Sequence, residues 1–356
     1  MSSQLTRHMF PGGNTANGFV GFFPHILSIR DANRIYVTKG GPGVGKSTLM
    51  KRIGQAAQDR GYAVEYFHCS SDPDSLDAIH IPALRVAMLD GTAPHVVDPQ
   101  MPGAVDGITN LGEFLMDDRM QAYKEAIGEI QDNVSRSFGR AFRFLSAARQ
   151  IREDAAASYA VDEGARHKLL GKWMDRIFEA VPMGDHVGRE RDLYLSAITP
   201  KGLVHFLDEF SARHRWRVRA PWGTDLSEGL KLLSRMACMR GLNVECYHCA
   251  LDADRIEHLY ISGLDLLIST ENEYHAATVS AERTIDLTEG FVTPLDAKRI
   301  DIDQQLFDIL VEQAVESLAR AKALHDDLEA YYIDHMNYAG VQEKFDELVA
   351  QIFPEH

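Results

Sequence analysis

The sequence lacks any apolar run that approaches the roughly 20 residues needed to cross a bilayer. Its N-terminal stretch MSSQLTRHMFPGG also lacks the apolar core of a secretory signal, so we expect a cytoplasmic protein that does not enter a membrane. Positive charge is scarce as well: 37 Lys and Arg face 52 Asp and Glu, which gives a formal net charge of −15. This negative net charge argues against non-specific electrostatic binding to nucleic acid.

Cysteine is rare, with four in 356 residues. Cys246 and Cys249 form a C-x-x-C pair, which could be a redox pair or half of a zinc site. However, the surrounding VECYHC is typical of a strand, in which an offset of three puts two side chains on opposite faces. Cys69 has no such neighbour. We therefore favour buried structural thiols over redox or metal chemistry.

A long internal repeat is present. RGYAVEYFHCSSDPD at 60–74 and RGLNVECYHCALDAD at 240–254 are identical at eight of 15 positions, 180 residues apart. Upstream the spacing becomes 184, where RHMFPGGNTANG at 7–18 matches RDLYLSAITPKG at 191–202. Both halves end in apolar residues that recur every three or four positions, over 138–159 and 306–331. The pattern predicts two domains, a first unit at 1–185 and a second unit at 186–356, each with a long helical tail.

Within each unit the order is strand, glycine-rich turn, helix, strand, strand and helical tail. In the first unit the predicted strands are 34–38, 63–69 and 85–90. Strands that alternate with helices indicate an α/β fold with a parallel sheet covered by helices.

The glycine-rich turn of the first unit contains a motif that predicts nucleotide binding. GGPGVGKST satisfies G-x-x-x-x-G-K-[ST], the P-loop pattern, and the predicted nucleotide contacts are Gly40, Gly41, Pro42, Gly43, Val44, Gly45, Lys46, Ser47 and Thr48. Glycines let successive N–H groups converge on phosphate oxygens, and the start of the next helix adds its positive end. Lys46 supplies charge to the β- and γ-phosphates, and Ser47 is the predicted Mg²⁺ ligand.

A second metal ligand is predicted in the apolar strand RVAMLD, which ends in Asp90. Either Asp90 helps Ser47 to hold Mg²⁺, or it caps the turn before Gly91. No acidic residue follows Asp90 directly, and the adjacent glutamate of many strongly hydrolytic ATPases is therefore missing. The sequence also lacks an N-K-x-D guanine-recognition motif, which favours ATP over GTP.

The second unit has lost this loop. Its counterpart reads APWGTDLSEGLK, in which Pro221, Asp225 and Leu226 replace Gly41, Gly45 and Lys46, and Thr270 replaces Asp90. An aspartate repels phosphate and a leucine cannot supply the charge of an ammonium. We expect one nucleotide per chain, with the second unit structural or regulatory and packed on the first as an intramolecular pseudo-dimer.

Other chemistry-bearing residues of the first unit have identical counterparts in the second: His68, Cys69, Asp72, Asp74 and His95. They either hold the fold together or serve something other than the nucleotide. Asp72, Asp74 and Asp77 follow a predicted strand, where they could position a water or an acceptor hydroxyl or could be ordinary turn residues. We rank Lys46 and Asp90 as the catalytic candidates, with Asp72, Asp74 and His95 behind them.

GGNTANGF, KGGPGVGKSTLMKRIG, HCSSDPDSLD and DGTAPHVVDP together resemble a family of uncharacterised bacterial ATPase-like proteins with tandem P-loop NTPase units. The resemblance implies ATP binding and hydrolysis at residues 40–48 and supplies no second substrate. In that family the second unit often has its own P-loop, and APWGTDLSEGL departs from this pattern.

Three functions remain open from the sequence. The first is a Mg²⁺-dependent ATPase with one active site. The second is a small-molecule kinase whose arginine-bearing helical region closes over the phosphates, and these arginines are Arg136, Arg140, Arg143, Arg149 and Arg152. The third is a nucleotide sensor that binds without turnover.

Overall fold

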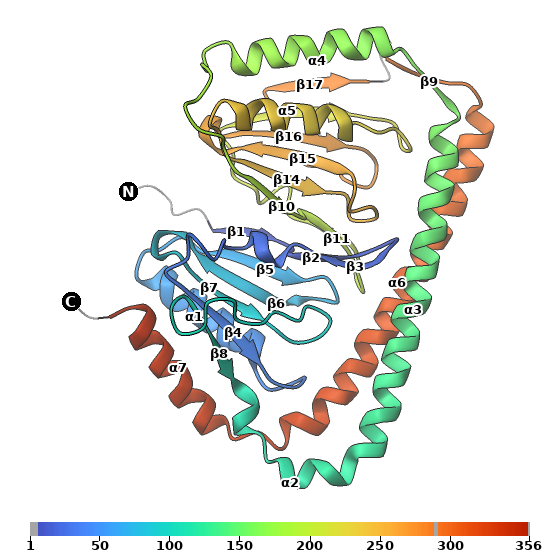
Figure 1. Ribbon diagram of the computed structural model, residues 1–356. Coiled ribbons are helices and arrows are strands. Elements are labelled where there is room, and N and C mark those ends of the chain that lie inside the picture. Colours follow the sequence, from blue (N-terminus) through green and yellow to red (C-terminus); the bar gives the residue numbers. More distant parts are fainter. Residues whose placement is uncertain (1–5, 288–290, 355–356) are drawn as a thin grey trace.

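A computed structural model describes residues 6–287 and 291–354. The outermost ends of the two predicted domains, 1–5 and 355–356, lie outside this description. The chain forms two six-stranded sheets, one above the other, and two long helices run along one side of both (Figure 1).

The first sheet has the order β1-β5-β6-β7-β4-β8. Its strands are β1 (Arg7–Met9), β4 (Arg34–Lys39), β5 (Glu65–Cys69), β6 (Asp72–Ile81), β7 (Val86–Asp90) and β8 (Asp106–Asn110). β4 is parallel to both its neighbours, β7 and β8, whereas β6 is antiparallel to β5 and β7. The predicted strands are therefore present within two residues, but the sheet is mixed. The prediction of an α/β fold is confirmed, and that of a parallel sheet only in part, because β6 returns antiparallel after a two-residue connection that is too short for a crossover.

The second sheet repeats this topology, in the order β10-β14-β15-β16-β13-β17. Its strands are β10 (Glu190–Leu193), β13 (His214–Arg219), β14 (Val244–His248), β15 (Ile256–Ile261), β16 (Leu266–Glu271) and β17 (Arg283–Asp286). Two hairpins repeat as well, at the 184-residue spacing: β2 (Gly12–Thr15) with β3 (Gly18–Gly21), and β11 (Ser196–Thr199) with β12 (Gly202–His205). The internal repeat of the sequence is thus a repeat of structure.

One helix packs on each sheet directly after its glycine-bearing loop. These are α1 (Lys46–Asp59) and α5 (Ser227–Met239). In α1, Leu49, Met50, Ile53 and Ala57 recur every three or four residues and are buried, so that one helical stripe faces the sheet.

The helical tails are confirmed. The first comprises α2 (Asp117–Met120), α3 (Lys124–Ala156) and α4 (Glu163–Phe178), and the second comprises α6 (Ala297–Ile333) and α7 (Tyr338–Ile352). α3 and α6 pack side by side, and the short strands β9 (Tyr159–Val161) and β18 (Val292–Pro294) pair beyond them (Figure 1). Five short 3₁₀ turns complete the described elements: Phe23–His25, Pro82–Leu84, Leu111–Phe114, Gln121–Tyr123 and Ser262–Leu264.

The ends of the two tails are exchanged between the sheets. Ile177 and Phe178 of α4 are buried in the core of the second sheet, together with Leu230 of α5. Leu348 and Ile352 of α7 are buried in the core of the first sheet, beside α1. Each sheet is therefore covered by the tail that begins in the other half of the sequence (Figure 1).

A buried ionic cluster joins the two halves where the sheets meet. Arg7 and Arg191 occupy equivalent positions, and each contacts both Glu65 and Glu245. Burial opposes ionisation of Glu65, yet Arg191 and its other hydrogen-bonding partners hold the pKa of this carboxyl well below its usual value. The backbones of Phe10 and Tyr194 also pair across this contact.

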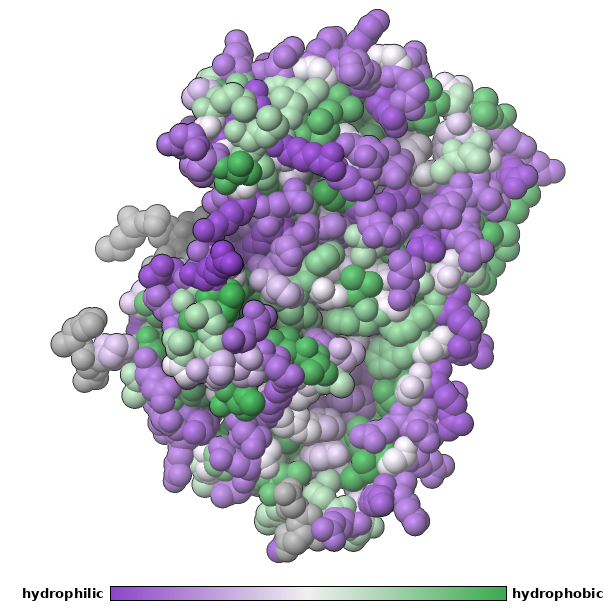
Figure 2. Space-filling model, viewed as in Figure 1, coloured by the Kyte–Doolittle hydropathy of each residue, from purple (hydrophilic) through white to green (hydrophobic). Residues whose placement is uncertain are grey.

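Within residues 6–287 and 291–354, we find no helix with the length and apolar character of a membrane span. Hydrophilic residues cover most of the face shown in Figure 2, with smaller apolar areas between them. The four cysteines form no disulfide, and burial raises the pKa of Cys246.

Candidate functional site

The Gly40–Thr48 loop connects the end of β4 to the start of α1. Gly40, Gly43 and Gly45 have φ angles of +146°, +70° and +93°, which lie in a region that side chains other than glycine rarely adopt. Three glycines of the sequence motif thus stand where the backbone needs a positive φ angle. The loop turns at the carboxyl end of a parallel strand and leads directly into a helix N-terminus, a combination suited to anions.

The Lys46 side chain turns back into this loop. Its Nζ donates hydrogen bonds to the carbonyl oxygens of Gly40 and Gly41, each at 2.9 Å. The same atom lies 3.7 Å from Asp90 Oδ2, and the two side chains are only 11% and 13% exposed. A buried cation therefore sits between the loop and the end of β7.

The contacts of Asp90 confirm its predicted role in the turn and place its other oxygen beside Lys46. Oδ1 accepts hydrogen bonds from the N–H (2.8 Å) and the hydroxyl (2.6 Å) of Thr92, which closes the turn after β7. Oδ2 faces Lys46. Oδ1 therefore stabilises the turn after β7, and Oδ2 faces the Gly40–Thr48 loop through Lys46.

Ser47, the other predicted metal ligand, accepts a hydrogen bond at its Oγ from the N–H of Leu76, at 2.9 Å. In the second unit Ser227 Oγ accepts the same bond from Ile256, also at 2.9 Å. This contact therefore belongs to the fold of both units. It uses one lone pair of the hydroxyl and leaves the other free.

Asp77 and His95 form a buried pair beside Asp90. Ala78 pairs with Leu89 in the β6–β7 ladder, so Asp77 lies next to Asp90 at the end of that ladder. His95 Nε2 is 3.6 Å from Asp77 Oδ1. Burial raises the pKa of Asp77 to about 6; the charge of His95 opposes this rise and that of Asp90 adds to it.

The second unit keeps this pair as Glu257 and His275, with 3.5 Å between Oε2 and Nε2. Because the pair persists where the lysine is lost, it is not tied to that lysine. The spacing of 18 residues between acid and histidine in both units is the sequence signal that could have revealed it.

Asp72 and Asp74 follow the carboxyl end of β5, as predicted, but they also begin β6. Their carboxylates contact lysines of the second unit. Lys322 of α6 is 3.6 Å from Asp72, and Lys201 is 2.5 Å from Asp74. The Lys201 hydrogen bond lowers the pKa of the exposed Asp74 carboxyl. Both aspartates therefore contribute to the contact between the units.

The end of α6 covers the Gly40–Thr48 loop. The sequence did not predict this contact. Glu329 Oε1 accepts a hydrogen bond of 3.2 Å from the N–H of Gly43. A Cβ added at Gly41 would lie 2.8 Å from the ring of Tyr332. Nothing in the sequence distinguishes Glu329 from the other charged residues of its helix.

The equivalent loop of the second unit is arranged differently. Asp225 accepts a hydrogen bond from the N–H of Ser227, and its carboxylate pairs with Arg255 at 3.1 Å. The end of α3 lies against Gly223, as the end of α6 lies against the first loop. Arg152 of α3 lines a cavity here, whereas Arg136, Arg140 and Arg143 are exposed.

His68 and His248 also make matching contacts. Nδ1 of His68 bonds the carbonyl of Pro73, and Nδ1 of His248 bonds that of Ala253. Burial lowers the pKa of His68 to about 4, so that its ring is neutral at physiological pH. Each histidine therefore makes a local hydrogen bond to the backbone of its own unit.

Comparison with protein-family models, curated proteins and solved structures gives no match for this chain. The resemblance to ATPase-like proteins with tandem P-loop units stays a prediction.

Proposed function

We propose that the Gly40–Thr48 loop is a P-loop that binds ATP with Mg²⁺, and that the first unit hydrolyses this ATP slowly. The observation that carries the proposal is the position of Lys46. Its ammonium is held by two carbonyl oxygens of the loop, opposite the Asp90 carboxylate, on a backbone that only glycine readily adopts. These are the parts that a triphosphate site needs.

The residues fit the proposed ligands. Lys46 would exchange the carbonyls of Gly40 and Gly41 for phosphate oxygens, while the loop N–H groups and the start of α1 receive the remaining negative charge. The free lone pair of Ser47 and the Oδ2 of Asp90 would hold Mg²⁺, directly or through water. The metal, when bound, neutralises charge that develops on the phosphate oxygens.

Slow turnover is expected because the position after Asp90 carries no carboxylate that could activate water. The residue after Asp90 is a glycine. Asp77 is 3% exposed and already faces His95, and its counterpart persists in a unit without the lysine. A site that turns over slowly suits a conformational ATPase.

Glu329 supports coupling of this site to the second half of the chain. Its carboxylate takes the Gly43 N–H that a phosphate would need, so ATP and the end of α6 compete for the loop. α6 leads into α7, which packs on α1. We infer that ATP binding displaces Glu329 and shifts these helices within an intramolecular pseudo-dimer. The kinase alternative gains no such support, since Arg152 lies in the second unit's cavity.

The test is ATP binding and phosphate release by the intact chain with MgCl₂. Lys46→Ala should weaken ATP binding at least about tenfold, because charge-assisted hydrogen bonds to phosphate contribute roughly 1.5–3 kcal/mol each. Lys51→Ala, an exposed lysine of the same helix, is the control and should behave as wild type. Unchanged ATP binding by Lys46→Ala would refute the assignment. Phosphate transfer that depends on an added metabolite would favour a kinase.

A further inference from the structure

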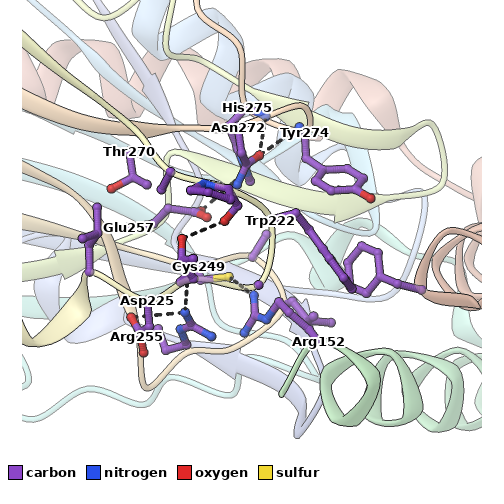
Figure 3. A pocket seen from close by; sticks show the side chains of 18 of the residues that line it. Arg152, Trp222, Asp225, Cys249, Arg255, Glu257, Thr270, Asn272, Tyr274 and His275 are labelled. Carbon is purple, nitrogen blue, oxygen red and sulfur yellow. Dashed lines mark hydrogen bonds and ion pairs between the residues drawn. The ribbon is translucent and has the colours of Figure 1, made fainter. Parts of the chain in front are cut away.

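The second unit contains a cavity of about 100 Å³ at the place where the first unit carries its Gly40–Thr48 loop. It is lined by residues 220–226, by the ends of the central strands β15 and β16, and by residues of α3 and α6. Figure 3 shows Arg152 reaching from α3 toward Cys249, with the Trp222 indole nearby. The unit that lost its lysine has thus kept a cavity at the same position.

Two residues that line this cavity carry buried donors without acceptors. Among the residues that the structure describes, Trp222 Nε1 and Arg152 Nε have no hydrogen-bond partner. Trp222 is 4% exposed, and the Arg152 side chain is 11% exposed. Arg152 donates through Nη1 to Cys249 and lies 3.5 Å from Asp252, which holds its guanidinium in place. Buried N–H groups without acceptors are costly, and a ligand oxygen would satisfy them.

Acceptors are also unsatisfied in the same cavity. Glu257 Oε2 accepts no hydrogen bond within the described part of the chain, although His275 lies 3.5 Å away. Thr270, which replaces Asp90, has an unpaired hydroxyl under the same condition. The residues that line the cavity thus carry a guanidinium and an indole N–H together with a carboxylate and a hydroxyl.

The remaining walls are largely apolar and include Ile198, Leu226 and Phe307. The volume is below the roughly 150 Å³ of an engineered cavity that binds benzene, and it is far too small for a nucleotide. The occupant is therefore small, partly hydrocarbon, and able both to accept and to donate hydrogen bonds.

We propose that this cavity binds a short-chain organic acid that also carries a donating group, either a hydroxyl or an ammonium. Its carboxylate accepts from Arg152 and Trp222, its donating group bonds to Glu257, and its hydrocarbon chain packs against the apolar walls. This site is separate from the proposed ATP site, and its binding does not depend on that proposal.

The first test is calorimetric titration of the intact chain with four matched probes. L-Valine and 2-hydroxyisovalerate carry both the carboxylate and the donating group. Isovalerate lacks the donating group, and valinamide lacks the carboxylate. Binding of at least one of the first two, with isovalerate and valinamide at least about tenfold weaker, is expected because each charged hydrogen bond contributes about that factor. Equal binding of valinamide, or no binding of any probe, would overturn the proposal.

Variants tie the binding to the cavity. Arg152→Gln should weaken it about tenfold or more, and Trp222→Phe should weaken it severalfold because a smaller aromatic ring remains while the N–H donor is lost. Arg143→Gln, an exposed arginine on the same helix, is the control. If Arg152→Gln does not fold, Trp222→Phe decides alone. Wild-type affinity in the folded variants contradicts the proposal. ATP binding, measured separately, reports only on the first unit.

Discussion

Replacing Glu329 by Gln should tighten ATP binding. Glu329 Oε1 accepts the Gly43 N–H at 3.2 Å, and a hydrogen bond from His325, supported by the Gly43 N–H, keeps the pKa of Glu329 below its usual value. The carboxylate is therefore charged at neutral pH and competes with phosphate. The change to an amide removes this charge and keeps the size of the side chain.

The magnitude follows from two effects. A hydrogen bond to a charged acceptor exceeds one to a neutral acceptor by about 1 kcal/mol. Repulsion between a half-buried carboxylate and a phosphate some 5 Å away adds roughly 1 kcal/mol at a dielectric constant between those of water and the protein surface. The sum predicts ATP affinity about five- to thirtyfold higher than in the wild type.

The assay is an equilibrium titration with ATP and Mg²⁺ at fixed salt. Glu312→Gln is the matched control, since it removes the same charge from an exposed position on the same helix, about 25 Å away along its axis. It should change ATP affinity by less than about twofold. Equal or weaker ATP binding by Glu329→Gln would refute the competition between this carboxylate and phosphate.

Three further predictions follow from the contacts. Ser47→Ala should raise the Mg²⁺ concentration needed for half-maximal turnover, whereas Ser227→Ala, which removes the matching hydrogen bond of the second unit, should leave it unchanged; equal shifts would show a purely structural effect. Asp90→Asn should also raise that midpoint, and an unmoved midpoint would reduce Asp90 to a turn residue. Because the folded pKa of Asp77 is raised to about 6, the folded state holds this proton to higher pH than the unfolded chain, and stability falls as pH rises from about 4 to 6. Asp77→Asn should remove about 2 kcal/mol of that fall in denaturant titrations at the two ends of this range; an identical fall in the variant would contradict the cause given for the pKa.

Much of the fold could be predicted from repetition within the chain. The 180- and 184-residue spacings identify equivalent segments, which prove to be equivalent strands and hairpins. β6 was missed because its first residues, Asp72-Pro73-Asp74, are typical of a turn, and its apolar residues begin only at Leu76. Local pattern could not show that this segment continues the sheet.

The exchange of tails could not be predicted, and neither could the residues that it brings to the loops. Ile177-Phe178 and Ile352-Phe353 have the same apolar character, so an amphipathic stripe shows which face is buried but not against which sheet. Glu329 and Arg152 lie on charged helices and look like solvated residues in sequence. Their roles depend on tertiary contacts between the two halves of the chain.

The measurement that tests the central claim most directly is the stoichiometry of ATP binding, by calorimetric titration of the intact chain in the presence of Mg²⁺. We expect one ATP per chain, lost in Lys46→Ala and not raised to two in Leu226→Lys, because Asp225 still faces the second loop and Pro221 supplies no backbone N–H there. A value near two would show that the second unit is a nucleotide site, and no binding would contradict the assignment of the Gly40–Thr48 loop.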